Sequence, residues 1–181
     1  CAHYVIKGIN IRIVFSLFSG YEHMIDTYRS YVPWIIHWCS IGYQYSEKRC
    51  ALPMHLHLYL TPFKKLLPSR DVVLDKIHVN SAYTWNCKPR NKIIIYRLEE
   101  WFKVLIHESF HFFGFEDFKS TDDHLLKKCF PLDVPLYIGE AYGEFWARTI
   151  TCFYCAYFID KEFSRKNATL NHFYRLMYIE R

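Results

Sequence analysis

The segment His107-Glu108-Ser109-Phe110-His111 contains residue types that can bind a metal ion and use it. Two histidines four residues apart on a helix point to the same side, about one turn apart, so both imidazoles can bind one small ion. Glu108 lies between them and can take a proton from a water molecule that attacks a carbonyl. The motif therefore predicts metal-assisted hydrolysis. The alternative interpretation is a buried histidine pair that is hydrogen-bonded to Glu108.

A catalytic zinc ion usually takes three protein ligands, so the pair needs a third. Glu140 and Glu144 are four residues apart on an expected helix, and we favour Glu140 as the ligand and Glu144 as the carboxylate that orients a histidine ring. The alternative for these two glutamates is a solvated helix edge. The competing ligand is Asp117, which follows His111 in the pattern H-x-x-G-x-x-D, with Gly114 able to turn the chain back.

Hydrophobic periodicity predicts the elements that must position these residues. Alternating residues predict a strand over 54–60, β-branched residues predict a strand or short hairpin over 5–18, and residues 77–85 and 92–97 are expected to pair as a hairpin. Helices are expected over residues 21–38 with a bend or break at Pro33, from Glu99 and Glu100 to Gly114, from about Pro135 to residue 159, and over residues 171–180.

The length of 181 residues predicts a single α+β domain. Residues 1–118 are expected to form a mixed, twisted sheet and the motif helix, and residues 119–181 a mainly helical part that carries the third-ligand helix. A loop is expected over residues 119–133. Residues 62–76 form a polar connection.

Composition excludes several classes of protein. Hydrophobic residues make up 51% of the chain and glycines number only six, which excludes a disordered or collagen-like chain. The 23 lysines and arginines are spread out with no run longer than two, so we predict no nucleic-acid partner. The apolar stretches are shorter than the ~20 residues that a membrane span needs, so none is predicted.

Seven cysteines is an odd number, and their spacing shows no disulfide framework. We therefore expect free thiols and a reducing compartment. Cys152 and Cys155 are expected to be two buried thiols rather than a metal or redox site. His55 and His57 share one face of a strand and are interpreted as part of its polar outer surface.

With these motifs in place, the chain resembles a small zincin metallopeptidase, closest to the thermolysin-like gluzincins. The order of strands and helices over residues 1–160 fits that family, and Asn80, Ser81, Ala82 and Tyr83 resemble its substrate-binding edge strand. Such an edge pairs with an extended peptide. The resemblance implies Zn²⁺ held by His107, His111 and Glu140, with Glu108 as the base and Glu144 behind a histidine. The candidates for the transition-state stabiliser are His172, Tyr157 and Tyr174.

The segment from Ile95 to Glu108 is also similar to uncharacterised H-E-x-x-H proteins of large cytoplasmic DNA viruses. This second resemblance implies a cytoplasmic or virion location. The expected function is a zinc metalloendopeptidase that hydrolyses peptide bonds by Glu-assisted attack of zinc-bound water on a peptide or protein substrate. The rival is a structural virion component, partnered by other virion or assembly proteins, in which zinc only stabilises the fold.

Overall fold

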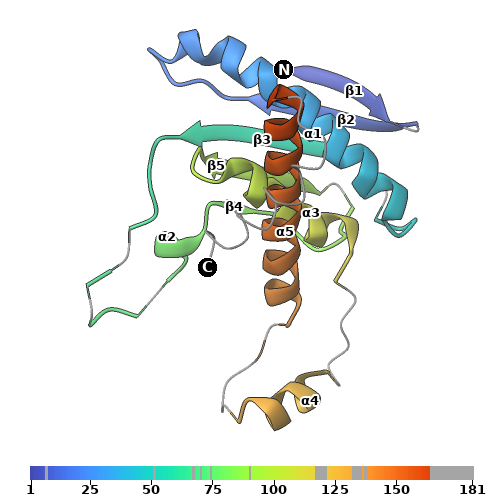
Figure 1. Cartoon of the computed structure of the whole chain (residues 1–181), viewed down its shortest axis with the longest axis vertical. Coiled ribbons are helices and arrows are strands. Elements are labelled where there is room, and N and C mark those ends of the chain that lie inside the picture. The colour runs from blue at the N-terminus through green and yellow to red at the C-terminus, as the bar shows by residue number, and fades with distance from the viewer. Residues whose placement is uncertain are drawn as a thin grey trace. The chain divides into compact units, whose positions relative to one another are not determined.

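The computed structural model describes residues 1–163 except 7, 51, 67, 70, 74, 90, 117–121, 132–135 and 137 (Figure 1). The chain divides into two compact units, Cys1–Phe115 and Glu116–Arg181, and each is described by itself. The first unit contains β1 (Ala2–Ile6), β2 (Ile9–Phe15), η1 (Glu22–Met24), α1 (Ile25–Tyr45), β3 (Met54–Thr61), α2 (Lys76–Val79), β4 (Ala82–Tyr83), β5 (Lys92–Arg97) and α3 (Trp101–Phe113). The second contains α4 (Asp122–Cys129) and α5 (Ile138–Phe163).

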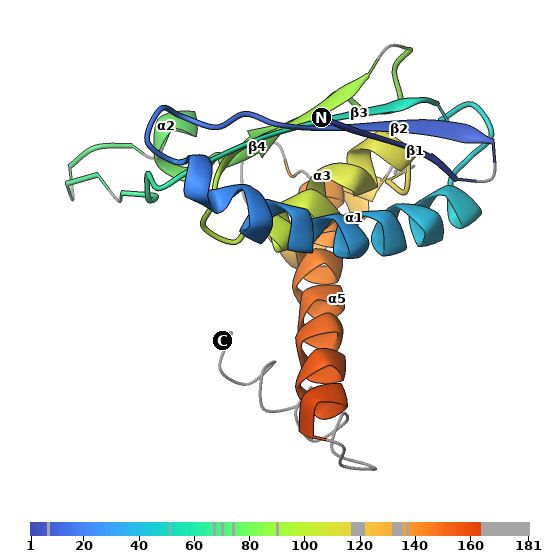
Figure 2. The same ribbon diagram turned by 90° about the horizontal axis from the view of Figure 1, so that it is seen from above.

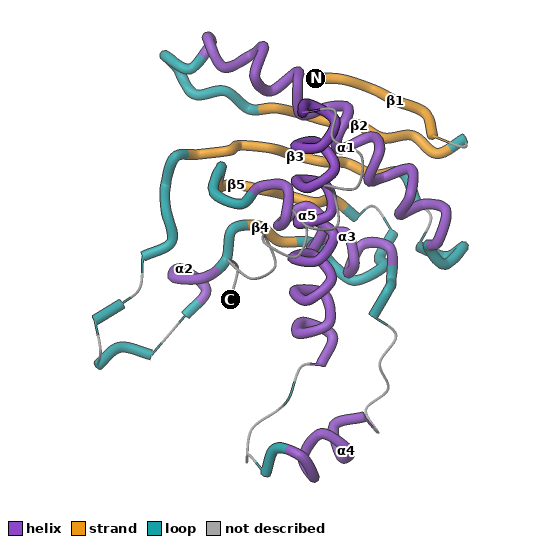
Figure 3. The backbone as a smooth tube through the Cα atoms, in the orientation of Figure 1, coloured by secondary structure: helices purple, strands orange, loops and turns teal. Residues whose placement is uncertain are grey.

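The strands of the first unit form one five-stranded sheet in the order β1-β2-β3-β5-β4 (Figure 3). The central pairs β2–β3 and β3–β5 are parallel, whereas the outer pairs β1–β2 and β4–β5 are antiparallel. The predicted mixed sheet is therefore confirmed, and a mixed sheet with helices is compatible with the α+β class. The antiparallel pair β4–β5 confirms the hairpin expected before α3, and the pair β1–β2 shows that the segment expected near the N-terminus as a strand or short hairpin is a hairpin.

The register gives the sheet one apolar and one polar face. Ile13, Leu56 and Ile93 lie side by side on β2, β3 and β5, and none of them is exposed. The neighbouring row on the other face consists of basic side chains at directly paired positions, namely His3, Arg12, His55 and Lys92. The predicted outer position of His55 and His57 is confirmed by the alternating burial of β3. Burial lowers the pKa of His57, and the charge of Lys92 lowers it further.

Helices α1 and α3 cover the apolar face of the sheet (Figure 2). Aromatic contacts join them in sequence order, among them Tyr31 with Trp101, Trp34 with Phe102, Trp38 with Phe110 and Tyr43 with Phe113. Because residue numbers rise together along both helices, α1 and α3 run in the same direction. Gly42 permits a close approach of the two helices, since a Cβ there would lie 2.1 Å from the ring of Phe113.

The structure differs from the predictions for α1 and for residues 77–85. Helix α1 continues through Pro33 to Tyr45 and is not divided there. Residues 77–85 are not all extended, because α2 occupies the first part and only β4 is a strand. A local turn explains α2: the backbone N–H of Asp75 donates to Nδ1 of His78, and the N–H of His78 donates to the carbonyl of Asp75.

Helix α3 begins at Trp101, so Glu99 and Glu100 precede it and do not open it as predicted. Glu100 is the N-cap residue in a left-handed conformation with φ 55°, and its carboxylate contacts the ammonium groups of Lys65 and Lys103 at 3.1 and 3.4 Å. Burial alone would raise the pKa of Glu100, but the hydrogen bond from Lys65 and the nearby charge of Lys103 outweigh it and lower the pKa.

The second unit also differs from its prediction. The expected loop over residues 119–133 contains α4, and α5 begins at Ile138 rather than near Pro135. The sequence of α4 is mostly polar and ends with two lysines in its last turn, so the apolar periodicity that predicts helices is weak there. The helix predicted over residues 171–180 lies outside the described residues. Within the described part of the chain, no helix is long and apolar enough to cross a membrane.

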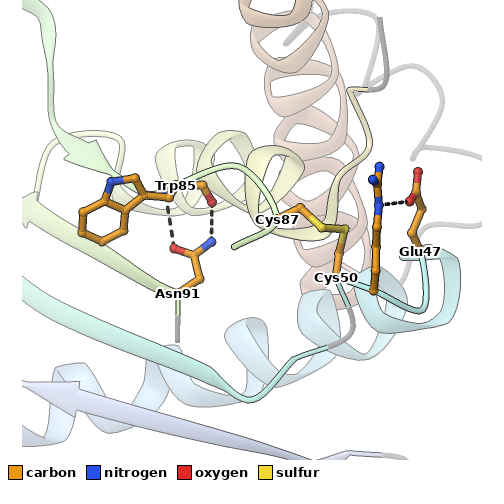
Figure 4. The surroundings of a disulfide bond; sticks show 6 residues. Glu47, Cys50, Trp85, Cys87 and Asn91 are labelled. Atoms are coloured by element: carbon orange, nitrogen blue, oxygen red, sulfur yellow. Dashed lines mark hydrogen bonds and ion pairs between the residues drawn. A yellow bond between two sulfur atoms is a disulfide. The ribbon is translucent and has the colours of Figure 1, made fainter. Parts of the chain in front are cut away.

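A disulfide joins Cys50, which follows α1, to Cys87 in the turn between β4 and β5 (Figure 4). The expectation of a disulfide-free chain is therefore wrong. The other five cysteines carry thiols, with Cys152 buried and Cys155 partly buried. A bond that closes 37 residues stabilises the fold by roughly 3–5 kcal/mol in the chain-entropy account.

Candidate metal centre

His107 and His111 lie one turn apart on α3, and both side chains are partly buried. Their Nε2 atoms are 3.3 Å apart. Two nitrogens bound at roughly 2.0–2.1 Å to a tetrahedral zinc ion are themselves about 3.3–3.4 Å apart. The predicted placement of the two imidazoles on one side of a helix is confirmed, and their spacing fits a shared ion.

A buried hydrogen bond on the other side of α3 sets the direction of the histidines. Ser109 is fully buried, and its Oγ accepts a hydrogen bond of 2.7 Å from Nε1 of Trp38 on α1. The same hydroxyl donates to the carbonyl of Ile106. Because residues two apart on a helix are rotated by about 200°, fixing Ser109 against α1 turns His107 and His111 away from α1.

Glu108 is buried, with 9% of its surface exposed. The charge of Glu108 acts on Tyr96 near the end of strand β5. Burial raises the pKa of Tyr96, the charge of Arg97 lowers it, and the charge of Glu108 raises it further. The carboxylate of the motif therefore occupies a shielded position close to the sheet. Electrostatic interactions are stronger in such a position than in water.

The carboxyl end of α3 is held by groups from two other segments. Gly114 ends the helix with φ 71°, as predicted for a left-handed C-terminal residue, and its N–H donates to the carbonyl of His111. The backbone N–H of Cys87 donates to the same carbonyl at 3.1 Å. A Cβ on Gly114 would lie 2.7 Å from the sulfur of Cys50, so the disulfide lies directly against this turn.

Among the described residues, His107 and His111 on α3 and Glu140 on α5 each offer one atom that can bind a metal ion. Two imidazole nitrogens and one carboxylate oxygen form a donor set that suits zinc, and three protein ligands leave a coordination position for water. The residues present therefore fit the ion that the sequence analysis anticipated.

The other predicted site residues fall into three groups. Glu144, expected behind a histidine, forms an ion pair of 2.8 Å with Arg148 on α5. Asp117, His172 and Tyr174 lie outside the described residues, and Tyr157 is exposed. The predicted edge-strand residues are at β4, which is an edge of the sheet: Ser81 and Ala82 are buried, whereas Asn80 and Tyr83 are exposed.

Three residues that support the site were not identified from the sequence. Trp38, Cys50 and Cys87 contact α3 from segments far away in the chain. The only available signal for Trp38 was its position on the apolar face of a predicted helix. Nothing in the cysteine spacing indicated the pairing of Cys50 with Cys87.

Comparisons with known proteins do not place the chain in a family. No protein-family model, curated protein or solved structure matches it.

Proposed function

We propose that the protein is a zinc-dependent metallopeptidase of the zincin type. The observation that carries this proposal is the 3.3 Å separation of the Nε2 atoms of His107 and His111, on a motif that also contains the buried Glu108. Glu140 is the third ligand in this proposal. A histidine pair alone would fit a structural site. The added Glu108 supplies the acid–base group that hydrolysis requires.

Each residue of the site has a separate role in this mechanism. His107, His111 and Glu140 would hold the ion through two nitrogens and one oxygen. Bound there, zinc would polarise a carbonyl and lower the pKa of water. Glu108 accepts the proton of the attacking water and then delivers it to the leaving amine nitrogen. Glu144 is proposed to orient one of the ligands from behind.

The edge of the sheet supports a peptide as the substrate. Strand β4 pairs with β5 on one side, through Ala82 and Tyr83 opposite Ile95 and Ile94, and no other described strand pairs with it. An extended peptide can add to such an edge by backbone hydrogen bonds. Tyr83 and Trp85 are each more than 40% exposed at this edge, which favours apolar side chains in the substrate.

Peptide hydrolysis by the intact, zinc-loaded chain tests the proposal. Quenched fluorescent peptides with apolar and aromatic residues serve as probes, and zinc content is measured by mass spectrometry. We expect about one zinc per chain, and we expect Glu108→Gln to keep the zinc while losing at least ~10²-fold in hydrolysis. The matched control is Glu99→Gln, which removes an exposed carboxylate outside the motif and should leave both quantities unchanged.

Two results would contradict the enzyme. Hydrolysis that is unchanged in Glu108→Gln removes this glutamate from the mechanism. Zinc bound by four protein ligands, measured by X-ray absorption, assigns the ion to fold stabilisation, as in a structural virion or assembly protein.

A further inference from the structure

We propose that the Cys50–Cys87 disulfide positions the metal ligand His111, in addition to any general stabilisation of the fold. This inference rests on the proposed metal site. It starts from the location of His111 in the last turn of α3, where helix carbonyls lack intrahelical partners and the backbone tends to fray. A ligand in such a turn needs outside support.

The support comes from the backbone of Cys87. Its N–H donates to the carbonyl of His111 at 3.1 Å, alongside the N–H of Gly114 at 3.2 Å. Cys87 makes this bond from a left-handed conformation with φ 42°, which is unfavourable for any residue with a Cβ. A residue free to relax would leave that conformation, and its N–H would then turn away from His111.

Two constraints keep Cys87 in place. On one side, the buried amide of Asn91 accepts from the backbone N–H of Trp85 and donates to its carbonyl, which closes the turn (Figure 4). On the other side, the disulfide ties Cys87 to Cys50, whose side chain is fully buried. Because the Cys50 sulfur also lies against Gly114, one covalent bond contacts the end of α3 and fixes the residue that bonds to it.

Zinc affinity in two disulfide-free variants tests this role. Outer groups that orient ligands typically contribute 10- to 100-fold to metal affinity. We expect Cys50→Ala/Cys87→Ala to bind zinc at least ~10-fold more weakly than the wild type, in competition with a chromophoric chelator. The zinc affinity of Cys50→Ala/Cys87→Gly should lie between those of the wild type and of Cys50→Ala/Cys87→Ala, because glycine adopts positive φ without the Cβ penalty. Glycine raises the conformational entropy of the unfolded chain, so a loss of stability alone would make the glycine variant the weaker zinc binder. A partial rescue by glycine therefore indicates that the disulfide positions His111.

The matched control is Cys39→Ala. Cys39 is also a fully buried cysteine of the first unit, but its sulfur contacts Met54 on β3 rather than α3. This variant should lose stability and keep its zinc affinity. Circular dichroism identifies the temperature range in which every variant is folded, and affinities are compared there.

Reduction of the wild-type chain provides a second measurement if the variants do not fold. A phosphine reductant becomes its oxide, a water molecule supplies the oxygen and the two thiol protons, and the titratable thiols should rise from five to seven. After removal of the reductant, the reduced chain should show the same ~10-fold loss of zinc affinity. Equal affinity with and without the disulfide overturns this inference and leaves the metallopeptidase intact. A wild-type chain that binds no zinc overturns both.

Discussion

The indole N–H of Trp38 donates a 2.7 Å hydrogen bond to the hydroxyl of Ser109, across 71 residues of sequence. The bond joins the middle of α1 to the middle of the histidine motif. Both partners are buried, so neither can exchange the other for water. The rotation of α3 about its axis is therefore set by a polar contact within an otherwise aromatic interface.

Ser109→Ala should lower the free energy of unfolding by about 1–3 kcal/mol, because the buried indole N–H loses its acceptor. Chemical denaturation measures this change. In the Trp38→Phe background the same serine substitution should cost clearly less, since no donor remains to be left unsatisfied. Equal costs in the two backgrounds would show that the hydrogen bond does not couple the helices.

Gly42→Ala should destabilise the first unit by about 1–3 kcal/mol, because its Cβ overlaps the ring of Phe113. Thermal unfolding checks the loss. The double variant Gly42→Ala/Phe113→Leu should be more stable than the sum of the two single losses predicts, since the smaller side chain makes room. Gly20→Ala is not a suitable control, because Gly20 has φ 88° and an alanine in that conformation would be strained whatever space surrounds it.

The third ligand is tested by three alanine substitutions. Glu140→Ala should remove most of the zinc affinity, and Glu144→Ala should weaken it by roughly 10- to 100-fold. Asp117→Ala should change it little. Isothermal titration with zinc gives the three values. The reverse order, with Asp117→Ala the most damaging, would assign the ligand to the segment just after Gly114 and leave the histidine pair in place.

Stability should decline in acid partly through Glu100. The folded pKa of this group is lowered, so its contribution is present above the unfolded pKa of about 4.5 and is lost as pH falls through the lower folded value. Glu100→Gln should therefore flatten the fall in stability below pH ~4.5, measured by urea denaturation at a series of pH values. Lys65→Met should flatten it similarly, because the hydrogen bond from Lys65 lowers this pKa. An unchanged slope in both variants would contradict the ion pair.

Periodicity predicted the elements whose residues alternate cleanly between core and solvent. Strand β5 has the predicted bounds, β3 extends only to Thr61 beyond its predicted end, and α3 ends at Gly114 as expected. In each of these segments local preference and burial agree. The first helix was predicted too short because apolar spacing alone does not show that a helix continues past Pro33.

Contacts between distant segments were beyond prediction from the sequence. Helix α2 depends on a histidine side chain that bonds to the backbone of Asp75, and the α3 N-terminus depends on Lys65. The disulfide depends on the fold bringing the end of α1 to the turn before β5. The candidate site could be predicted to the extent that His107 and His111 share one side of one helix. The role of Glu140 remains a proposal for the titrations to test.

The order of the strands also has a kinetic consequence. The hairpins β1–β2 and β4–β5 involve neighbours in sequence, but Ile11 pairs with Met54 only after α1 has crossed between them. Parallel pairings of this kind raise the contact order and slow folding, because the entropy cost of closing the loop comes before the favourable contacts that offset it. We expect the edge hairpins to gain protection from hydrogen exchange early and β3 to gain it late. Until β3 is in place, strand β5, against which the histidine helix packs, lacks its parallel neighbour.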